Sequence, residues 1–163
     1  MRSGVVAFAF GSPETIYSNT RIGHIASSMA RALGAPVFTQ LDVPISPDLE
    51  VVLTEERVGT HPPTLRIARG AASWAKDCGL EKLYVVAAKP HMWRAVRDLK
   101  LAVLETGKES ISVLSCEEIG MYPMGAWFSK HSQQRRTRSL LAFLPREIVL
   151  RVLPKFLYKR FAA

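Results

Sequence analysis

Residues 83–94 read LYVVAAKPHMWR, and the prediction of the fold starts from this stretch. Leu83–Ala88 is an apolar run typical of a buried strand, and Pro90 cannot continue a sheet. The apolar side chains that follow recur at helical spacing. They are Met92, Ala95, Val96, Leu99, Ala102 and Val103. The sequence therefore predicts a buried strand that runs directly into a helix.

A candidate site lies in the first turn of this helix. His91 and Arg94 are three residues apart, so they share one face. The first turn also presents unpaired N–H groups and the positive end of the helix dipole, both of which attract anions. Open α/β sheets bind ligands where strands meet helices, so this pair predicts a site for an anionic ligand. The alternative is that His91 only caps its own helix and that Arg94 only points into solvent.

The rest of the chain alternates between strand and helix patterns. Four further apolar runs have strand character: Val5–Phe10, Ala35–Leu41, Val51–Leu53 and Ile111–Leu114. One helical pattern ends at Gly34, and another begins at Pro62-Pro63. This alternation predicts an α/β fold, a three-layer αβα Rossmann-like domain with a mostly parallel sheet of about five strands.

The link between the second and third strands is short and contains Pro44 and Pro47. A parallel crossover usually needs about a dozen residues or more. We therefore expect these two strands to be antiparallel neighbours, or one of them to lie outside the main sheet.

The basic charge is concentrated at the C-terminus. From Lys130 onward there are nine Lys and Arg residues and one acidic residue, Glu147, whereas the preceding chain is balanced. We expect an α/β ligand-binding domain over residues 1–134 and a basic helical extension over residues 135–163, packed on or beside it. Because the charge belongs to the extension and not to the domain, binding to nucleic acid is not expected.

The extension has two interpretations. Arg151, Lys155 and Lys159 form a basic stripe, and the apolar residues between them form a broad second side. Such a helix either lies on an anionic membrane surface or docks its apolar side on the sheet or on a second subunit of a homo-oligomer. Docking is favoured, because a small α/β domain needs its layers covered.

Several classes of protein are not expected. The chain contains no apolar run long enough to span a membrane. It begins without the pattern of a signal peptide, so we expect a cytoplasmic protein. Two cysteines predict no disulfide framework, and four scattered histidines predict no metal site. The common phosphate-loop, dinucleotide and hydrolase motifs are absent.

The candidate ligand residues follow the strands, because the carboxyl ends of parallel strands face one crevice. Arg21 and Arg94 are expected to bind the anion, and His91 to act as acid/base or hydrogen-bond donor. Glu56 is expected to orient His91 or to contact the ligand. For Asn19, a helix cap is the simpler alternative. The remaining candidates are Gly11, Ser12, Thr60, Lys89 and Glu117.

The order of these elements resembles a known family. A first strand that ends in glycine, an Arg-bearing helix, Glu56…Thr60…Thr64 before a helix, and His91-x-x-Arg94-Ala95 after a strand are similar to the YdcF/SanA/ElyC-like domain of unknown function. The similarity covers roughly residues 5–99. It implies a Rossmann-type fold, and S-adenosylmethionine binding as in some members. It also implies pocket roles for Gly11, Arg21, Glu56, Thr60, His91 and Arg94. The turn after the second strand, Thr39-Gln40-Leu41, departs from the family's Ser-Gly-Gly-like turn.

Two functions fit these observations. The first is binding of a small anionic or nucleotide-like ligand, either S-adenosylmethionine or a phosphorylated metabolite, in the crevice of the sheet, in an enzyme or in a pure binder. The second is a non-catalytic module that acts through its basic amphipathic extension, at a membrane surface or in a homo-oligomer.

Overall fold

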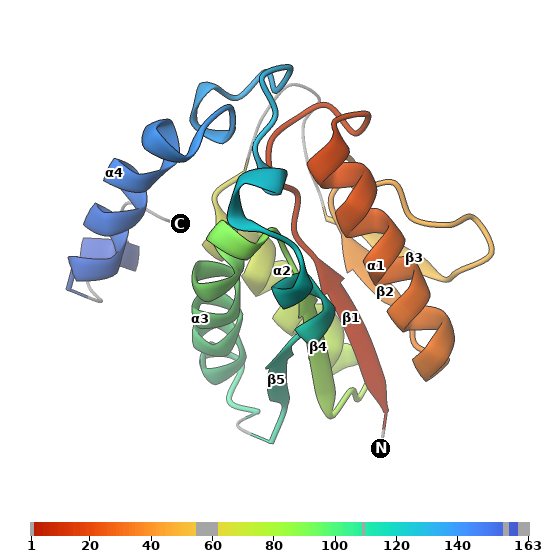
Figure 1. Cartoon of the computed structure of the whole chain (residues 1–163). Coiled ribbons are helices and arrows are strands. Elements are labelled where there is room, and N and C mark those ends of the chain that lie inside the picture. The colour runs from red at the N-terminus through yellow and green to blue at the C-terminus, as the bar shows by residue number, and fades with distance from the viewer. Residues whose placement is uncertain (1, 55–61, 109, 155–156, 160–163) are drawn as a thin grey trace.

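Five parallel strands form the centre of the computed structural model, which describes residues 2–54, 62–108, 110–154 and 157–159. The strands lie in the order β3-β2-β1-β4-β5 (Figure 1). They span Ser3–Ala7 (β1), Val37–Thr39 (β2), Val51–Leu53 (β3), Lys82–Val86 (β4) and Ser112–Ser115 (β5). The chain leaves β1 toward one edge of the sheet and later returns to β4 on the other side of β1. The predicted parallel α/β sheet is confirmed.

Helices cover both faces of this sheet. The α-helices of the described residues are α1 (Tyr17–Leu33), α2 (Thr64–Asp77), α3 (Lys89–Glu105) and α4 (Leu140–Val152). Alternate residues of β1 point to opposite faces: Val6 packs with α2 and α3, while Val5 and Ala7 pack with α1. The 3₁₀ helices η1 (Glu117–Met121) and η2 (Met124–Trp127) also lie on the α1 side, where Trp127 is fully buried. The molecule therefore has the predicted three layers.

The expected arrangement of the second and third strands is wrong. β2 and β3 are parallel neighbours, with Val37 opposite Val51. Because both strands are short, the return path is only about 10 Å long, and an extended chain covers it without a helix. The linking segment packs on α1, where Ser46 donates its N–H to Ser27 Oγ at 3.0 Å.

The C-terminal extension is helical over most of its described part. A third 3₁₀ helix, η3 (Arg135–Thr137), leads into α4, whose N-cap residue Ser139 accepts a hydrogen bond from the Ala142 N–H. The inner face of α4 buries Phe143, Glu147 and Leu150. Figure 1 shows α4 beyond the end of the sheet, on the side of α3. Among the described residues, no helix combines the length and apolar character needed to cross a bilayer.

Candidate functional site

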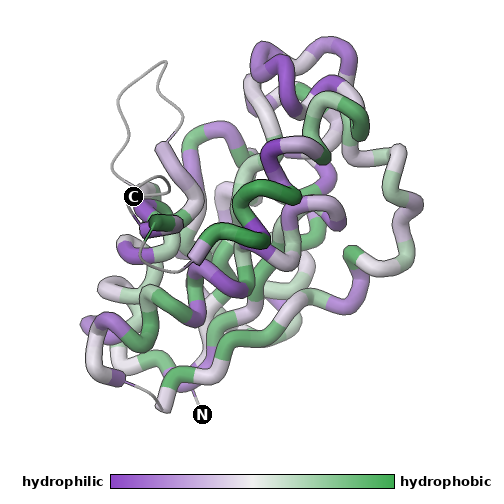
Figure 2. Tube along the Cα trace, turned by 90° about the vertical axis from the view of Figure 1, so that its left-hand side faces the viewer, coloured by the Kyte–Doolittle hydropathy of each residue, from purple (hydrophilic) through white to green (hydrophobic). Residues whose placement is uncertain are grey.

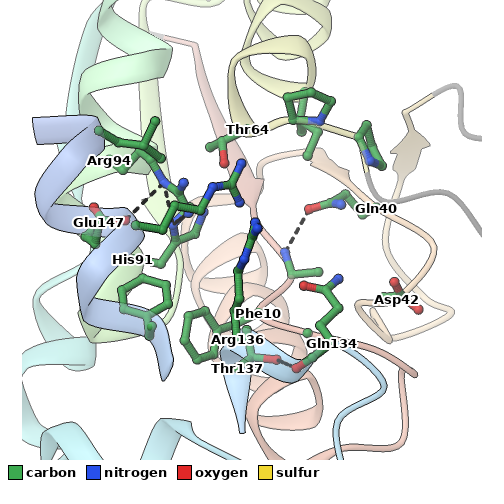
Figure 3. Close-up of a pocket in the computed structure, with 18 of the residues that line it drawn as sticks. Phe10, Gln40, Asp42, Thr64, His91, Arg94, Gln134, Arg136, Thr137 and Glu147 are labelled. Carbon is green, nitrogen blue, oxygen red and sulfur yellow. Dashed lines mark hydrogen bonds and ion pairs between the residues drawn. The ribbon is translucent and has the colours of Figure 1, made fainter. Parts of the chain in front are cut away.

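A cavity of about 530 Å³ opens at the carboxyl end of the sheet, where the chain leaves β1 in one direction and β4 in the other. This is the place where open α/β sheets bind ligands. The N-terminal ends of α2 and α3 contribute Thr64 and His91, and α4 and η3 close the opposite side (Figure 3). The lining from the strand ends consists of Ala9, Phe10, Gly11, Gln40 and Asp42.

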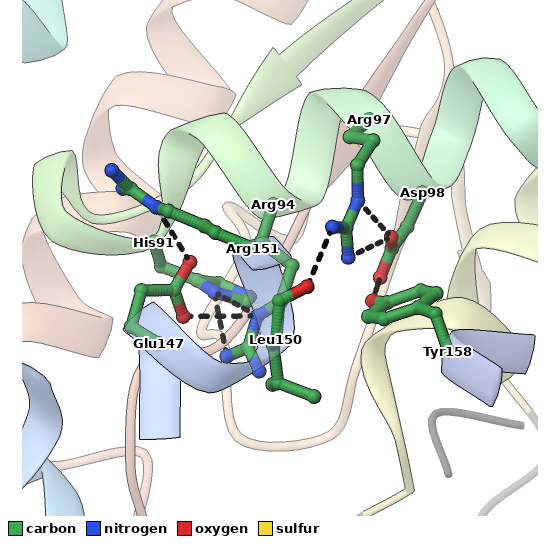
Figure 4. A network of polar contacts seen from close by, with 8 residues as sticks. All are labelled: His91, Arg94, Arg97, Asp98, Glu147, Leu150, Arg151 and Tyr158. Carbon is green, nitrogen blue, oxygen red and sulfur yellow. Dashed lines mark hydrogen bonds and ion pairs between the residues drawn. The ribbon is translucent and has the colours of Figure 1, made fainter. Parts of the chain in front are cut away.

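His91 is held in one protonation state. Its Nδ1 accepts hydrogen bonds from Arg94 Nη2 at 3.0 Å and from Arg94 Nε at 3.3 Å (Figure 4). A guanidinium can only donate, so Nδ1 carries no proton and the ring proton lies on Nε2. The side chain is 5% exposed. Burial, and then the charges of Arg94 and Arg146, lower the pKa of His91 well below its usual value. His91 is therefore a neutral imidazole with an Nε2–H donor.

Glu147, a residue of α4, balances the positive charge of Arg94. Its Oε2 lies 3.5 Å from Arg94 Nε, and its Oε1 lies 3.7 Å from Arg151 Nε. Only 2% of Glu147 is exposed, and Oε1 accepts no hydrogen bond from the described residues. Glu147, Arg94 and His91 thus form a chain of contacts that fixes the imidazole from the side of α4.

Three further arginines give the cavity its positive charge. Arg135 and Arg136 come from η3, and Arg146 comes from α4. Burial lowers the pKa of Arg146, and the like charges of Arg94 and Arg136 lower it further. Guanidinium groups that repel one another around a cavity are stabilised when an anion lies between them. The electrostatics therefore favour an anionic occupant.

The loop after β1 is closed by its own side chains. Asn19 Oδ1 accepts from the Phe10 N–H at 2.8 Å, and Asn19 Nδ2 donates to the Gly11 carbonyl at 3.0 Å. Gly11 has φ +96°, and a Cβ there would meet Ser132 Oγ and Thr137 Oγ1. The segment that leads into η3 therefore packs against Gly11. The cavity lies beside α2 and α3, and the described residues of α1 do not line it.

A second polar network holds Leu150 and Tyr158 of the extension on α3 (Figure 4). Tyr158 Oη donates to Asp98 Oδ2 at 2.5 Å, and Arg97 Nη1 donates to the Leu150 carbonyl at 3.0 Å. Asp98 is fully buried, and burial raises its pKa. Tyr158 and Leu150 also line the cavity, so this network fixes one of its walls.

The structure brings three of the predicted site residues to the cavity: Gly11, His91 and Arg94. The neighbouring Ser12 accepts hydrogen bonds at its carbonyl from the Gln133 N–H at 2.9 Å and from Ser132 Oγ at 3.4 Å. Asn19 closes the loop as described above and does not cap α1, whose N-cap is Ile16.

Other predicted residues lie elsewhere. Arg21 lies on the side of η1 and η2. Its guanidinium carbon is 3.9 Å from the ring centroid of Tyr17 and 4.1 Å from that of Tyr122. Lys89 donates from Nζ to the carbonyl of Gly120 at 3.0 Å, so it ties η1 to α3. Glu117 is exposed at the start of η1. Arg21, Lys89 and Glu117 occupy these positions because η1 covers this side of the sheet. Glu56 and Thr60 lie outside the described residues.

Sequence reasoning missed the residues that the extension contributes. Arg135, Arg136, Arg146 and Glu147 line the cavity, although the sequence predicted an extension packed on or beside the domain and named none of its residues as part of the site. Gln40 was also missed; its Oε1 accepts from the Ala9 N–H at 2.9 Å. The one available signal was Glu147, the single acidic residue after Lys130, because an isolated carboxylate among cations is typical of a buried partner.

No family model matches the chain, and no curated protein matches it either. The similarity to YdcF/SanA/ElyC-like proteins therefore stays a prediction from the motif order.

Proposed function

We propose that the cavity binds a small phosphorylated metabolite or nucleotide through its phosphoryl group. One observation carries this proposal: four arginines, Arg94, Arg135, Arg136 and Arg146, line one cavity, where the charges of Arg94 and Arg136 lower the pKa of Arg146. A phosphoryl group supplies the missing negative charge and matches the forked donors of arginine.

The surrounding elements support an anion in the same place. The N-terminal ends of α2 and α3 both reach the cavity, and each carries a partial positive charge. Arg135, Arg136 and Arg146 would hold the phosphoryl oxygens. Arg94 acts as a positioning residue, since its donors are directed at His91 and its charge is balanced by Glu147.

His91 would donate its Nε2–H to an acceptor oxygen of the ligand. A role in proton transfer is less suited to this geometry, because the imidazolium form would lie beside two guanidinium groups. A role of Nδ1 as base would require it to give up its hydrogen bonds from Arg94. His91 therefore serves ligand binding, as a neutral imidazole that donates a hydrogen bond.

S-adenosylmethionine fits this cavity less well than a nucleotide. It carries a sulfonium and an ammonium group beside one carboxylate, and the arginines that line the cavity repel these two positive groups. The four arginines among the described lining residues outnumber the two carboxylates, Asp42 and Glu147. Electrostatics therefore favour a phosphorylated ligand.

Calorimetric titration with inorganic pyrophosphate, ADP and S-adenosylmethionine tests the proposal. We expect pyrophosphate and ADP to bind and S-adenosylmethionine not to bind. R146Q and R136Q should each weaken pyrophosphate binding about tenfold to a hundredfold, since a hydrogen bond to a charged group contributes about 1.5–3 kcal/mol.

The matched control is R31Q, which removes the same charge from an exposed ion pair with Asp48. It should bind pyrophosphate like the unaltered protein. Equal affinities of R146Q, R136Q and R31Q would contradict the proposal, because the cavity arginines would then contribute nothing specific.

A further inference from the structure

The side of α4 that faces away from the cavity is apolar and uncovered in the described structure. Six large apolar side chains of α4 are exposed there, Leu141 by 83% and Val152 by 76%. We call this the outer face of α4; it consists of Leu140, Leu141, Leu144, Ile148, Val149 and Val152. Figure 2 views the molecule from the side on which α4 lies and shows hydrophobic residues in this helix next to hydrophilic ones. Contiguous exposed apolar patches mark interaction sites.

We infer that the outer face of α4 docks on an anionic lipid bilayer. The inner face is already occupied, because Phe143, Glu147 and Leu150 are buried against the rest of the molecule. The helix therefore has one face for the protein and a second apolar face with no partner among the described residues. A helix of 13 residues is about 20 Å long and is suited to lie in the plane of a membrane interface.

Charge complementarity identifies the partner. Arg138, just before α4, and Arg151, on α4, are exposed and do not line the cavity, whereas Glu147 is the single acidic residue after Lys130 and is buried. Exposed basic residues beside an apolar helix face are attracted to anionic lipid headgroups, each adding about fivefold in affinity.

Trp93 marks the rim of the same surface. Trp93 is exposed, and the guanidinium carbons of Arg97 and Arg151 lie 4.6 Å and 4.8 Å from the centroid of its ring. An indole next to guanidinium groups at the border of an apolar patch is typical of the boundary between lipid and water. Arg151 belongs to α4, so Trp93 lies beside this helix and would enter the headgroup region with it.

A second copy of the chain is a poorer partner for this surface. A symmetric dimer through the outer face of α4 would bring two sets of arginines together, without exposed carboxylates from the described part of either extension. Like charges across an interface oppose association. An anionic bilayer instead supplies the opposite charge and an apolar phase for the six side chains.

Co-sedimentation of the full chain with lipid vesicles tests the inference. We expect binding to phosphatidylcholine vesicles that contain phosphatidylglycerol, loss of this binding at high salt, and weak binding to pure phosphatidylcholine. The double variant L141E/V152E should bind the anionic vesicles about tenfold more weakly or worse, because it places two carboxylates on the apolar face.

M121E is the matched control, since Met121 is 76% exposed on η1 and not on α4. It should bind vesicles like the unaltered protein. L141S/V152S removes the apolar side chains without adding charge and should weaken binding in the same direction. Thermal unfolding should show that both double variants keep their fold, because the two positions are exposed.

Three results would overturn the inference: no binding of the full chain to anionic vesicles, unchanged binding of both double variants, or a dimer in light scattering that L141E/V152E dissociates. Pyrophosphate titration of L141E/V152E separates this inference from the proposed function. The cavity arginines are intact in this variant, so its pyrophosphate affinity should be unchanged.

Discussion

His91 shows how one residue can be fixed by its neighbours. Arg94 donates to Nδ1, Glu147 pairs with Arg94, and the ring centroids of Phe8 and Phe10 each lie 6.3 Å from that of the imidazole. Apolar rings and a guanidinium both disfavour the imidazolium, so the residue stays neutral. The chemistry available at this place is hydrogen-bond donation from Nε2.

This protonation state predicts a pH dependence of stability. The pKa of His91 is lowered in the folded protein, whereas an imidazole in the unfolded chain titrates near about 6.5. Between the two pKa values the unfolded chain binds the additional proton, so the free energy of unfolding falls as the pH is lowered from about 7 to about 5. Urea unfolding at a series of pH values measures this slope.

H91Q should reduce the slope, because it removes the titrating group and keeps an acceptor for Arg94. His24 is exposed on α1, so H24Q should leave the slope as it is. A slope that persists in H91Q and disappears in H24Q would contradict the assignment to His91.

Among the secondary-structure elements, α1 supports the link between β2 and β3. This link contains no helix of its own and packs on α1 instead. Gly23 makes this possible, because a Cβ at position 23 would collide with the carbonyl oxygen of Pro44. At the other end of the contact between α1 and the linking segment, Arg31 Nη2 donates to Asp48 Oδ1 at 2.7 Å. α1 therefore supports both the sheet and the linking segment.

G23A tests this contact. Alanine in a helix is normally favoured over glycine by about 1 kcal/mol. Here the obstructing atom is backbone, so we expect overpacking to prevail and the free energy of unfolding to fall by about 1–3 kcal/mol in urea unfolding. A Cβ at Gly120 meets nothing within 4 Å, so G120A should change stability little. Greater stability of G23A would show that the linking segment yields.

For the molecule as a whole, the C-terminal extension completes the cavity rather than the sheet. Among the described residues, α4 adds Phe143 to the core cluster on the α1 side of the sheet and nothing to the cluster between the sheet and α2–α3, whereas Arg146, Glu147 and Leu150 line the cavity. A division at residues 134–135, as expected from the sequence, would therefore separate most of the core from part of the candidate ligand site.

A chain ending at Arg138 tests this division. We expect it to keep a cooperative thermal transition in circular dichroism, at a lower temperature because Phe143 no longer covers Phe10. It should bind pyrophosphate much more weakly, since Arg146 is lost. Pyrophosphate affinity equal to that of the full chain would place the anion outside the cavity.

Local patterns were enough to identify most of the elements and the end of the sheet at which the cavity lies. The runs Val5–Phe10 and Leu83–Ala88 are long enough to be recognised as strands, and the helical spacing after His91 identifies α3. His91 and Arg94 were found because a strand followed at once by a helix brings its first turn to the carboxyl edge. Such signals can be read from neighbouring residues.

Which distant residues meet at this edge depends instead on tertiary packing. α4 is apolar on both sides, so its spacing does not indicate that Glu147 faces inward while Val152 is exposed. Arg21 follows the first strand as expected, yet η1 and η2 offer it aromatic rings. Arg146 approaches Arg94 because Tyr158 and Leu150 fix the extension on α3. Contacts between segments far apart in the chain leave no periodic trace in the sequence, and packing alone selects them.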